Sequence, residues 1–205
     1  MKTTLKSAIA LLVALPSLAF GATWDIDPAH SSAEFAVKHM MVSNVKGSFT
    51  IKSGAINLDD KDITKSTVDA TLDAATVNTG NAKRDEHLRA PDFFDTAKFP
   101  TITFKSTKVE KAGEGKLKVT GNLTMHGVTK PVVLDVTGPS KESKDPWGNT
   151  RTGVEATTKL NRKDFGLTYN AALETGGVAV SEEVNVTLDL SLTKKADATA
   201  TPAKK

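Results

Sequence analysis

The sequence predicts an all-β domain in which eight antiparallel strands form a sheet that is closed or folded on itself. Three observations support this prediction. Apolar and polar residues alternate with period two in much of the chain, as expected of strands with one buried face and one wet face. Turn-forming residues separate the alternating segments at mostly short spacing. Few helical crossovers lie between these segments, which favours an antiparallel sheet.

The strands are expected, in chain order, at residues 33–38, 47–58, 67–74, 101–110, 118–125, 130–137, 151–161 and 184–193. The alternation is clearest in the third, fifth and eighth segments. In the last one, apolar residues occupy every second position from Val184 to Leu192, and polar residues fill the positions between them. Turn-forming residues separate the segments at 59–60, 113–115, 127, 138–139 and 145–148.

A segment around residues 80–99 interrupts the alternation and predicts a short helix followed by a loop. Asn81 can cap a helix that continues to about Leu88, and Pro91 would end it. The loop then places Phe93, Phe94 and Phe99 in an irregular stretch. Because such an apolar cluster has to be covered, we expect the helix and loop to pack over one end of the barrel.

Both ends of the chain are expected to lie outside the folded domain, which we place at residues 22–193. Residues 1–21 have a charged start, an apolar run at 8–15 and small residues near Gly21, which is the pattern of a cleaved signal peptide. The apolar run is too short to span a bilayer. Residues 194–205 contain Ala, Thr and Lys but no large apolar residue, and predict a disordered tail. A secreted domain without cysteine is typical of the bacterial periplasm.

Composition excludes several classes of function. The chain has no cysteine, which excludes a disulfide scaffold, a thiol nucleophile, a cysteine-ligated metal and a lipoprotein anchor. The net charge is +3, and loss of the signal peptide would leave +1, so nothing indicates nucleic-acid binding. His30, His39, His87 and His126 include no pair at metal-binding spacing, and we expect no metal site.

The inward residues of the predicted barrel leave two interiors possible. Eight strands enclose a space that is either filled by side chains or able to hold one small ligand. The inward set is rich in Val, Ala, Leu and Thr and poor in aromatic residues, which favours a cavity. Ordinary filled barrels are built from the same residues, so the composition does not decide between the two.

Several motifs occur together, at residues 24–31 (Trp-Asp-Ile-Asp-Pro-Ala-His-Ser), 35–40, 78–81 with 84–85 and 87–88, 92–95, 99–102, 121–131 and 161–166. As a set, in this order, they closely resemble the YceI-like polyisoprenoid-binding family over nearly the whole domain. The resemblance implies a lipocalin-like, extended eight-stranded antiparallel barrel in the periplasm. It also implies a long apolar cavity for an amphiphile such as a polyprenyl phosphate, an isoprenoid quinone or a fatty-acid derivative. Homodimers and the absence of established catalysis are further implications.

Candidate ligand-binding residues follow from this picture. Polar groups near the opening of the barrel are expected to be His30, His39, Arg84, His87, His126 and Arg162, and apolar contacts are expected from Phe35, Leu88, Phe93, Phe94, Phe99 and Phe165. Each has a structural alternative. Arg84 could pair with Asp85 or Glu86, Arg162 could pair with Asp164 in a turn, and the phenylalanines could be ordinary core.

Three classes of function are therefore compared. The first is a carrier that binds an isoprenoid or another lipid without a covalent cofactor. The second is a stress-related interaction module whose barrel is filled. The third is a hydrolase built on Ser31 beside His30, or on His87 near Asp85, but the sequence lacks the Gly-x-Ser-x-Gly motif and adjacent strand residues point to opposite faces. We therefore assign no catalytic residue.

Overall fold

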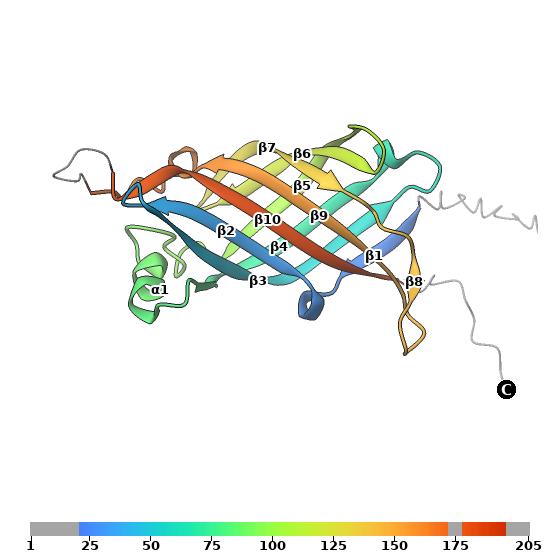
Figure 1. Ribbon diagram of the computed structural model, residues 1–205, viewed down its shortest axis with the longest axis horizontal. Coiled ribbons are helices and arrows are strands. Elements are labelled where there is room, and N and C mark those ends of the chain that lie inside the picture. Colours follow the sequence, from blue (N-terminus) through green and yellow to red (C-terminus); the bar gives the residue numbers. More distant parts are fainter. Residues whose placement is uncertain (1–20, 172–177, 196–205) are drawn as a thin grey trace, which may run out of the picture.

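The computed structural model of the protein describes residues 21–171 and 178–195, and within them ten strands form a single sheet (Figure 1). The strands are β1 (Ala22–Ile26), β2 (Ser32–His39), β3 (Ser43–Leu58), β4 (Thr67–Asn78), β5 (Thr101–Lys111), β6 (Lys116–Met125), β7 (Val128–Thr137), β8 (Ser143–Lys144), β9 (Thr150–Asn161) and β10 (Val180–Lys194). The helical elements are α1 (Ala82–Arg89) and the short 3-10 helices η1 (Pro28–His30), η2 (Ile63–Lys65) and η3 (Arg162–Phe165).

Eight of the strands in this described part close into an antiparallel barrel, as predicted. Their order is β10-β2-β3-β4-β5-β6-β7-β9, and β9 pairs with β10 to close the ring. The β9–β10 pairing is long, from Glu183 opposite Asn161 to Thr193 opposite Arg151. The β7–β9 pairing is short and involves three positions, beginning with Asp135 opposite Thr157.

The two additional strands, β1 and β8, were not predicted from the sequence. β1 and β2 pair with the same two neighbours, β10 and β3, at different heights. They therefore form two halves of one position in the barrel wall, separated by η1. At the break, Ser31 Oγ accepts a hydrogen bond from the backbone N–H of Ser191 at 2.9 Å, which replaces a bond of the ladder. β8 has two residues and pairs with the start of β9.

The predicted helix is present as α1 and covers one end of the barrel (Figure 1). Asn81 caps it, because its side-chain oxygen accepts a hydrogen bond from the backbone N–H of Arg84 at 3.1 Å. The same end carries the β2–β3 turn, the β6–β7 turn and η3, and we call it the helix end. The opposite end, which carries η2, the β5–β6 turn and β8, is the far end.

The buried core is divided into three clusters. One lies toward the far end and contains Trp24 and Leu192. A second contains Val119 and Ala156, and the third lies at the helix end around Phe165. Residues between the clusters, such as Leu188, are only partly buried although they face inward. This arrangement differs from the single contiguous core expected of a filled domain.

The predictions for the two ends of the chain lie mostly outside the described residues. This is the case for the signal peptide up to residue 20 and for the tail from residue 196 onward. The sheet extends slightly past the predicted domain boundary, because β10 includes Lys194 and the backbone N–H of Lys195 donates to the carbonyl of Thr23 at 2.8 Å. Within the described ranges, no helix has the length and apolar character needed to cross a membrane.

Candidate ligand-binding cavity

The barrel encloses an elongated cavity of about 450 Å³. It extends from His39 and Arg84 at the helix end to Ile63 and Pro139 at the far end. Its volume lies within the range of small-molecule sites, which is roughly 300–1,000 Å³. The interior is therefore not packed solid, as the filled-barrel alternative required.

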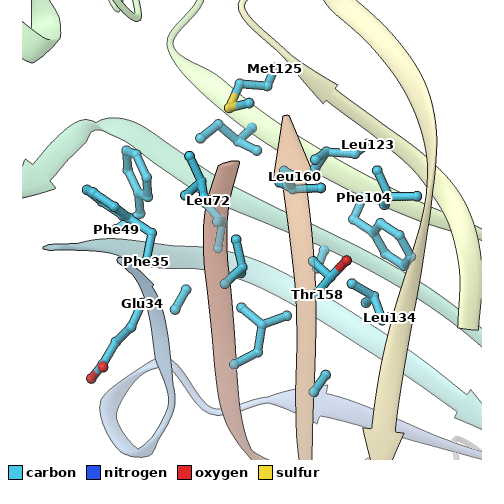
Figure 2. A pocket seen from close by; sticks show the side chains of 18 of the residues that line it. Glu34, Phe35, Phe49, Leu72, Phe104, Leu123, Met125, Leu134, Thr158 and Leu160 are labelled. Atoms are coloured by element: carbon cyan, nitrogen blue, oxygen red, sulfur yellow. The ribbon is translucent and has the colours of Figure 1, made fainter. Parts of the chain in front are cut away.

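Aliphatic and aromatic side chains form most of the cavity wall (Figure 2). They come from alternate positions of the strands, because successive strand residues point to opposite faces of a sheet. The labelled apolar residues that point into it are Phe35, Phe49, Leu72, Phe104, Leu123, Met125, Leu134 and Leu160. Such a wall offers an apolar chain a continuous surface with few hydrogen-bonding groups.

The arginine and histidine side chains of the described cavity wall lie together at the helix end. They are His39, Arg84, His87 and Arg162, which come from the end of β2, from α1 and from η3. At the far end, the polar side chain in the described wall is Ser66, which is buried. His39 and Tyr169 line the cavity and are also exposed, so the cavity reaches the surface at the helix end. The cavity is thus polarised along its length.

Arg162 is the buried cation of this site, with 3% of its surface exposed. Its guanidinium donates to three backbone carbonyls, those of Leu167 at 2.5 Å, Ser181 at 2.9 Å and Val180 at 3.3 Å. The predicted alternative of an ion pair with Asp164 is wrong, because these carbonyls take its place. Burial lowers the pKa of Arg162, and the charge of Glu182 opposes this shift. An arginine nevertheless stays protonated in proteins.

A break in the strand register lies at two of the three carbonyls that hold Arg162, those of Val180 and Ser181. Along β10, the pairing with β2 jumps from Val180 opposite His39 to Val184 opposite Val37. Such a β-bulge leaves extra residues outside the ladder. The carbonyl of Ser181, one of these residues, is then available to a side chain, and Nε of Arg162 donates to it. The charge of Arg162 is therefore solvated by dipoles of the backbone and not neutralised by a carboxylate of the described residues.

Arg84 also lines the cavity and also lacks the predicted salt bridge. Its Nε donates to the hydroxyl of Thr79 at 2.7 Å, and its Nη2 donates to the carbonyl of Thr79 at 3.0 Å. Asp85 is buried and instead accepts hydrogen bonds from the backbone N–H and the hydroxyl of Thr79. Thr79 thus orients both side chains, and the guanidinium of Arg84 remains at the cavity wall.

An aromatic row leads from the barrel interior to the surface at the helix end. Consecutive rings, with centroids 4.9–6.2 Å apart, are Phe35, Phe49, Phe94, Phe93, Tyr169 and His87. His87 is held by Asp92, whose carboxylate lies 2.8 Å from its Nε2, and this hydrogen bond lowers the pKa of Asp92. Phe93 and Phe94, two of the predicted loop phenylalanines, therefore belong both to the cavity wall and to the cover of this end.

Eight of the twelve predicted ligand-binding residues line the cavity, and they are Phe35, His39, Arg84, His87, Leu88, Phe93, Phe94 and Arg162. The other four lie elsewhere. Phe165 is buried in the cluster at the helix end. His126 occupies the β6–β7 turn, where its Nδ1 lies 3.1 Å from the carbonyl of Phe165 and its ring packs against Phe99. These three residues fix η3 and the turn to each other, outside the cavity wall.

His30 is the predicted residue farthest from this site along the wall, because it precedes β2 whereas His39 ends it. Its Nδ1 lies 2.8 Å from Asp27, whose carboxylate also pairs with Arg151. Arg151 holds the pKa of Asp27 at about 2, with a smaller contribution from His30. Arg151 likewise holds the pKa of Asp145 at about 2. This cluster of charged side chains connects η1 to β9 and does not line the cavity.

The arrangements considered for a hydrolase are not formed. Ser31 exchanges hydrogen bonds with the backbone of Ser191, and His30 is bound to Asp27. His87 is bound to Asp92 and not to Asp85. In the described ranges, no three His, Asp or Glu side chains come together as ligands of a metal ion would.

Several residues of the cavity wall were missed in the sequence. Phe49 and Phe104 lie at inward positions of strands that alternate only weakly, and a strict count of every second position would have found them. Tyr169 follows η3 in a segment without regular structure, and no local pattern indicates that it packs on α1.

The closed barrel with a polarised apolar cavity is the architecture of lipocalin-like proteins, which enclose one ligand among their strands. The YceI-like domain matches residues 24–192, and the chain belongs to the YceI-like family. A UPF0312 protein of Vibrio parahaemolyticus is 41% identical over 168 residues, which cover 81% of this chain and 88% of the relative. A UPF0312 protein of a Shewanella species is 41% identical over 170 residues, covering 82% and 88%.

Solved structures show the same fold. The YCEI protein of Campylobacter jejuni superposes with a TM-score of 0.66 at 30% identity and covers 93% of this chain and 100% of its own. BcnA of Burkholderia cenocepacia gives a TM-score of 0.67 at 22% identity, with 81% and 98% covered. A polyisoprenoid binding domain from Saccharophagus degradans gives 0.60 at 19% identity, with 85% and 99% covered. The last two likenesses establish the fold alone.

Proposed function

We propose that the protein binds a long-chain amphiphile in its barrel and carries it through the periplasm. The guest is a polyisoprenoid such as a polyprenyl phosphate or an isoprenoid quinone, or a fatty-acid derivative. The observation that carries this proposal is the polarity of the cavity, which is aliphatic along its length and cationic at the helix end. The chain of the guest lies along the barrel, and its head group lies at the helix end.

The apolar wall can supply enough free energy for useful affinity. Each methylene removed from water contributes about 0.8 kcal/mol. A guest that buries about ten methylene or methyl groups therefore gains about 8 kcal/mol, which corresponds to a dissociation constant of about 1 μM. This attraction has no direction, so it tolerates variation in the chain. Selectivity then depends on the polar groups at the helix end.

The cations at the helix end favour an anionic head group over a neutral one. Neither Arg84 nor Arg162 has a carboxylate partner among the described residues, and both line the cavity. A guanidinium has more N–H donors than the carbonyls around Arg162 accept, so donors remain for a ligand. Phosphate and carboxylate match this planar donor group well. Among the candidate guests, a prenyl phosphate or a fatty acid fits these groups better than a quinone.

The predicted signal peptide supports the periplasmic part of the proposal. The predicted signal peptide at residues 1–21 would direct the chain out of the cytoplasm. Between two membranes, a lipid chain needs a protein that shields it from water, and an enclosed apolar cavity provides that shield.

A titration with matched ligands tests the proposal. Farnesyl phosphate and farnesol share one isoprenoid chain and differ in the head group. The wild-type protein should bind both, and farnesyl phosphate should bind about tenfold to a hundredfold more tightly, because hydrogen bonds to charged groups contribute about 1.5–3 kcal/mol. In Arg162→Gln, this preference should fall while farnesol affinity changes little.

Lys163→Gln is the matched control, since Lys163 neighbours Arg162 but is exposed and paired with Glu182. It should keep the preference. Binding of neither ligand to the wild-type protein would overturn the proposal, and an unchanged preference in Arg162→Gln would overturn the assignment of the head group.

A further inference from the structure

Three consecutive apolar residues are exposed in the β2–β3 turn at the helix end. Their exposed fractions are 45% for Met40, 59% for Met41 and 83% for Val42. Tyr169, which is 40% exposed, lies at the same end of the barrel. Single exposed apolar residues are common on protein surfaces, but contiguous exposed apolar surface is typical of a contact with a partner or a membrane.

The geometry of the turn does not explain why methionines occupy it. The backbone N–H of Val42 donates to the carbonyl of His39 at 3.0 Å, and φ is 53° at Met40 and 59° at Met41. Two successive residues with positive φ favour asparagine and glycine, as in type I′ hairpin turns. The β6–β7 turn of the same barrel follows that rule at its second position, with Gly127 after His126. The methionine side chains are thus favoured neither by the backbone nor by burial.

The turn adjoins the cavity directly. His39, the residue before it, lines the cavity, and the backbone N–H of Met40 donates to the carbonyl of Ala179, which also lines the cavity. A partner or membrane that contacts Met40, Met41 and Val42 would therefore lie next to the helix end, where the cavity has its cationic groups.

Two lysines flank the turn on the outer face of the hairpin. Lys38 precedes it on β2 and Lys46 follows it on β3, while the alternate residues Val37 and Val45 face the cavity. Both lysines are exposed, and neither forms an ion pair with the described residues. Apolar side chains flanked by unpaired lysines suit an anionic lipid surface, because the side chains insert while the lysines stay near the phosphates.

We propose that residues 40–42 form a membrane-docking tip, which inserts into the surface of a bilayer that contains anionic phospholipid and places the helix end of the cavity against it. This inference rests on the proposed function, since docking there would let a lipid exchange between the bilayer and the barrel. The partner is the lipid surface itself. A second copy of the chain on the same turn is the competing occupant.

Flotation with vesicles of phosphatidylcholine and phosphatidylglycerol tests the tip. The test variant combines Met40→Asn and Met41→Gly, which removes both side chains and suits the positive φ angles, so the fold should be retained. Its vesicle binding should fall about tenfold per side chain removed, given the free energy of burying a methionine. Trp147→Ala is the control, because Trp147 is 80% exposed at the far end, and it should bind vesicles as the wild type does.

Charge is tested separately. The variant with Lys38→Gln and Lys46→Gln should bind the anionic vesicles more weakly, and added salt should weaken wild-type binding. Vesicles of phosphatidylcholine alone should bind less protein. The inference would be overturned if the wild-type protein does not bind anionic vesicles, or if the tip variant binds them as well as the wild type does. A dimer that dissociates in the tip variant would also overturn it, because a second copy would then cover the turn.

The affinity for farnesyl phosphate in solution separates this inference from the proposed function. In the variant carrying Met40→Asn and Met41→Gly, that affinity should be unchanged, while transfer of a prenyl lipid from vesicles to the protein should slow about tenfold or more. If the wild-type protein binds vesicles but no farnesyl phosphate, the proposed function fails and the docking tip stands. If it binds farnesyl phosphate but no vesicles, the reverse holds.

Discussion

Substitution of Leu188 by tryptophan would block the middle of the proposed binding cavity. Leu188 faces inward from β10, lines the cavity and packs against two of the three core clusters, so it lies between them along the barrel. An indole ring at this position would exclude about four methylene groups of a bound chain. At about 0.8 kcal/mol for each, the loss is about 3 kcal/mol, or roughly two hundredfold in the dissociation constant.

The assay is a titration of Leu188→Trp and of its control, Thr187→Trp, with farnesyl phosphate. Thr187 is the preceding residue and is exposed on the outer face of the same strand, so its substitution adds the same ring outside the barrel. It should leave affinity within about twofold of the wild type. Folding of both variants should be intact, since the cavity has room for the inward ring, whereas overpacking a filled core costs about 1–3 kcal/mol.

Two results would contradict the proposed position of the guest inside the barrel. A folded Leu188→Trp that binds farnesyl phosphate as the wild type does would show that the guest lies outside the barrel. A Leu188→Trp that loses several kcal/mol of stability, as judged by chemical denaturation, would show that the interior has no space at that position.

Three further predictions concern stability. Leu192 is fully buried and does not line the cavity, so Leu192→Ala should lower the free energy of unfolding by about 3 kcal/mol, more than Leu188→Ala, in urea titrations. Asn81→Ala should cost about 1 kcal/mol by the same method, because it removes the cap of α1. The pKa values of Asp27 and Asp145 are lowered in the folded protein, so the stability they confer is present above their ordinary pKa of 3.8 and is lost as pH falls toward about 2. Arg151→Gln should make this loss shallower when unfolding is followed from pH 5 to about pH 2.

Each stability prediction has a result that would contradict it. Equal losses in the two leucine variants would mean that both positions are packed alike. No change on removal of Asn81 would mean that the helix end is held by other contacts. If the Arg151 variant has the same acid transition as the wild type, the transition arises from groups other than Asp27 and Asp145.

The barrel could be predicted from the sequence because its strands have one apolar and one polar face. Alternation from Val184 to Leu192 is uninterrupted, and β10 is the strand with the longest pairing to a neighbour. β1 could not be predicted because it is short. It has only five residues, of which Trp24 and Ile26 are buried, so the apolar positions do not repeat often enough to form a recognisable pattern.

The candidate site was predicted in part, because sequence alone does not define the direction of each strand within the barrel. His30 and His39 flank the same strand and look alike in the sequence, yet β2 separates them by about 25 Å at the rise of an extended chain. His39 reaches the cavity and His30 does not. The partners of Arg162 were also beyond prediction, since Asp164 is its neighbour in the chain, whereas two of the carbonyls that hold it lie at a bulge in β10 and the third belongs to Leu167.

The presence of the cavity could not be inferred from composition, because Val, Ala and Leu build both filled and hollow barrels. The arrangement of the strands determines whether the interior is filled or hollow. Inward residues such as Leu188 border the cavity at positions where a filled barrel would have a facing side chain in contact with them.

Native mass spectrometry of protein purified without detergent measures directly whether the barrel holds a lipid chain. We expect the folded protein to carry a single guest of several hundred daltons, and Leu188→Trp to be recovered without it. Repeated detection of the bare polypeptide alone, with no uptake of farnesyl phosphate added to the wild-type protein, would contradict the proposed function.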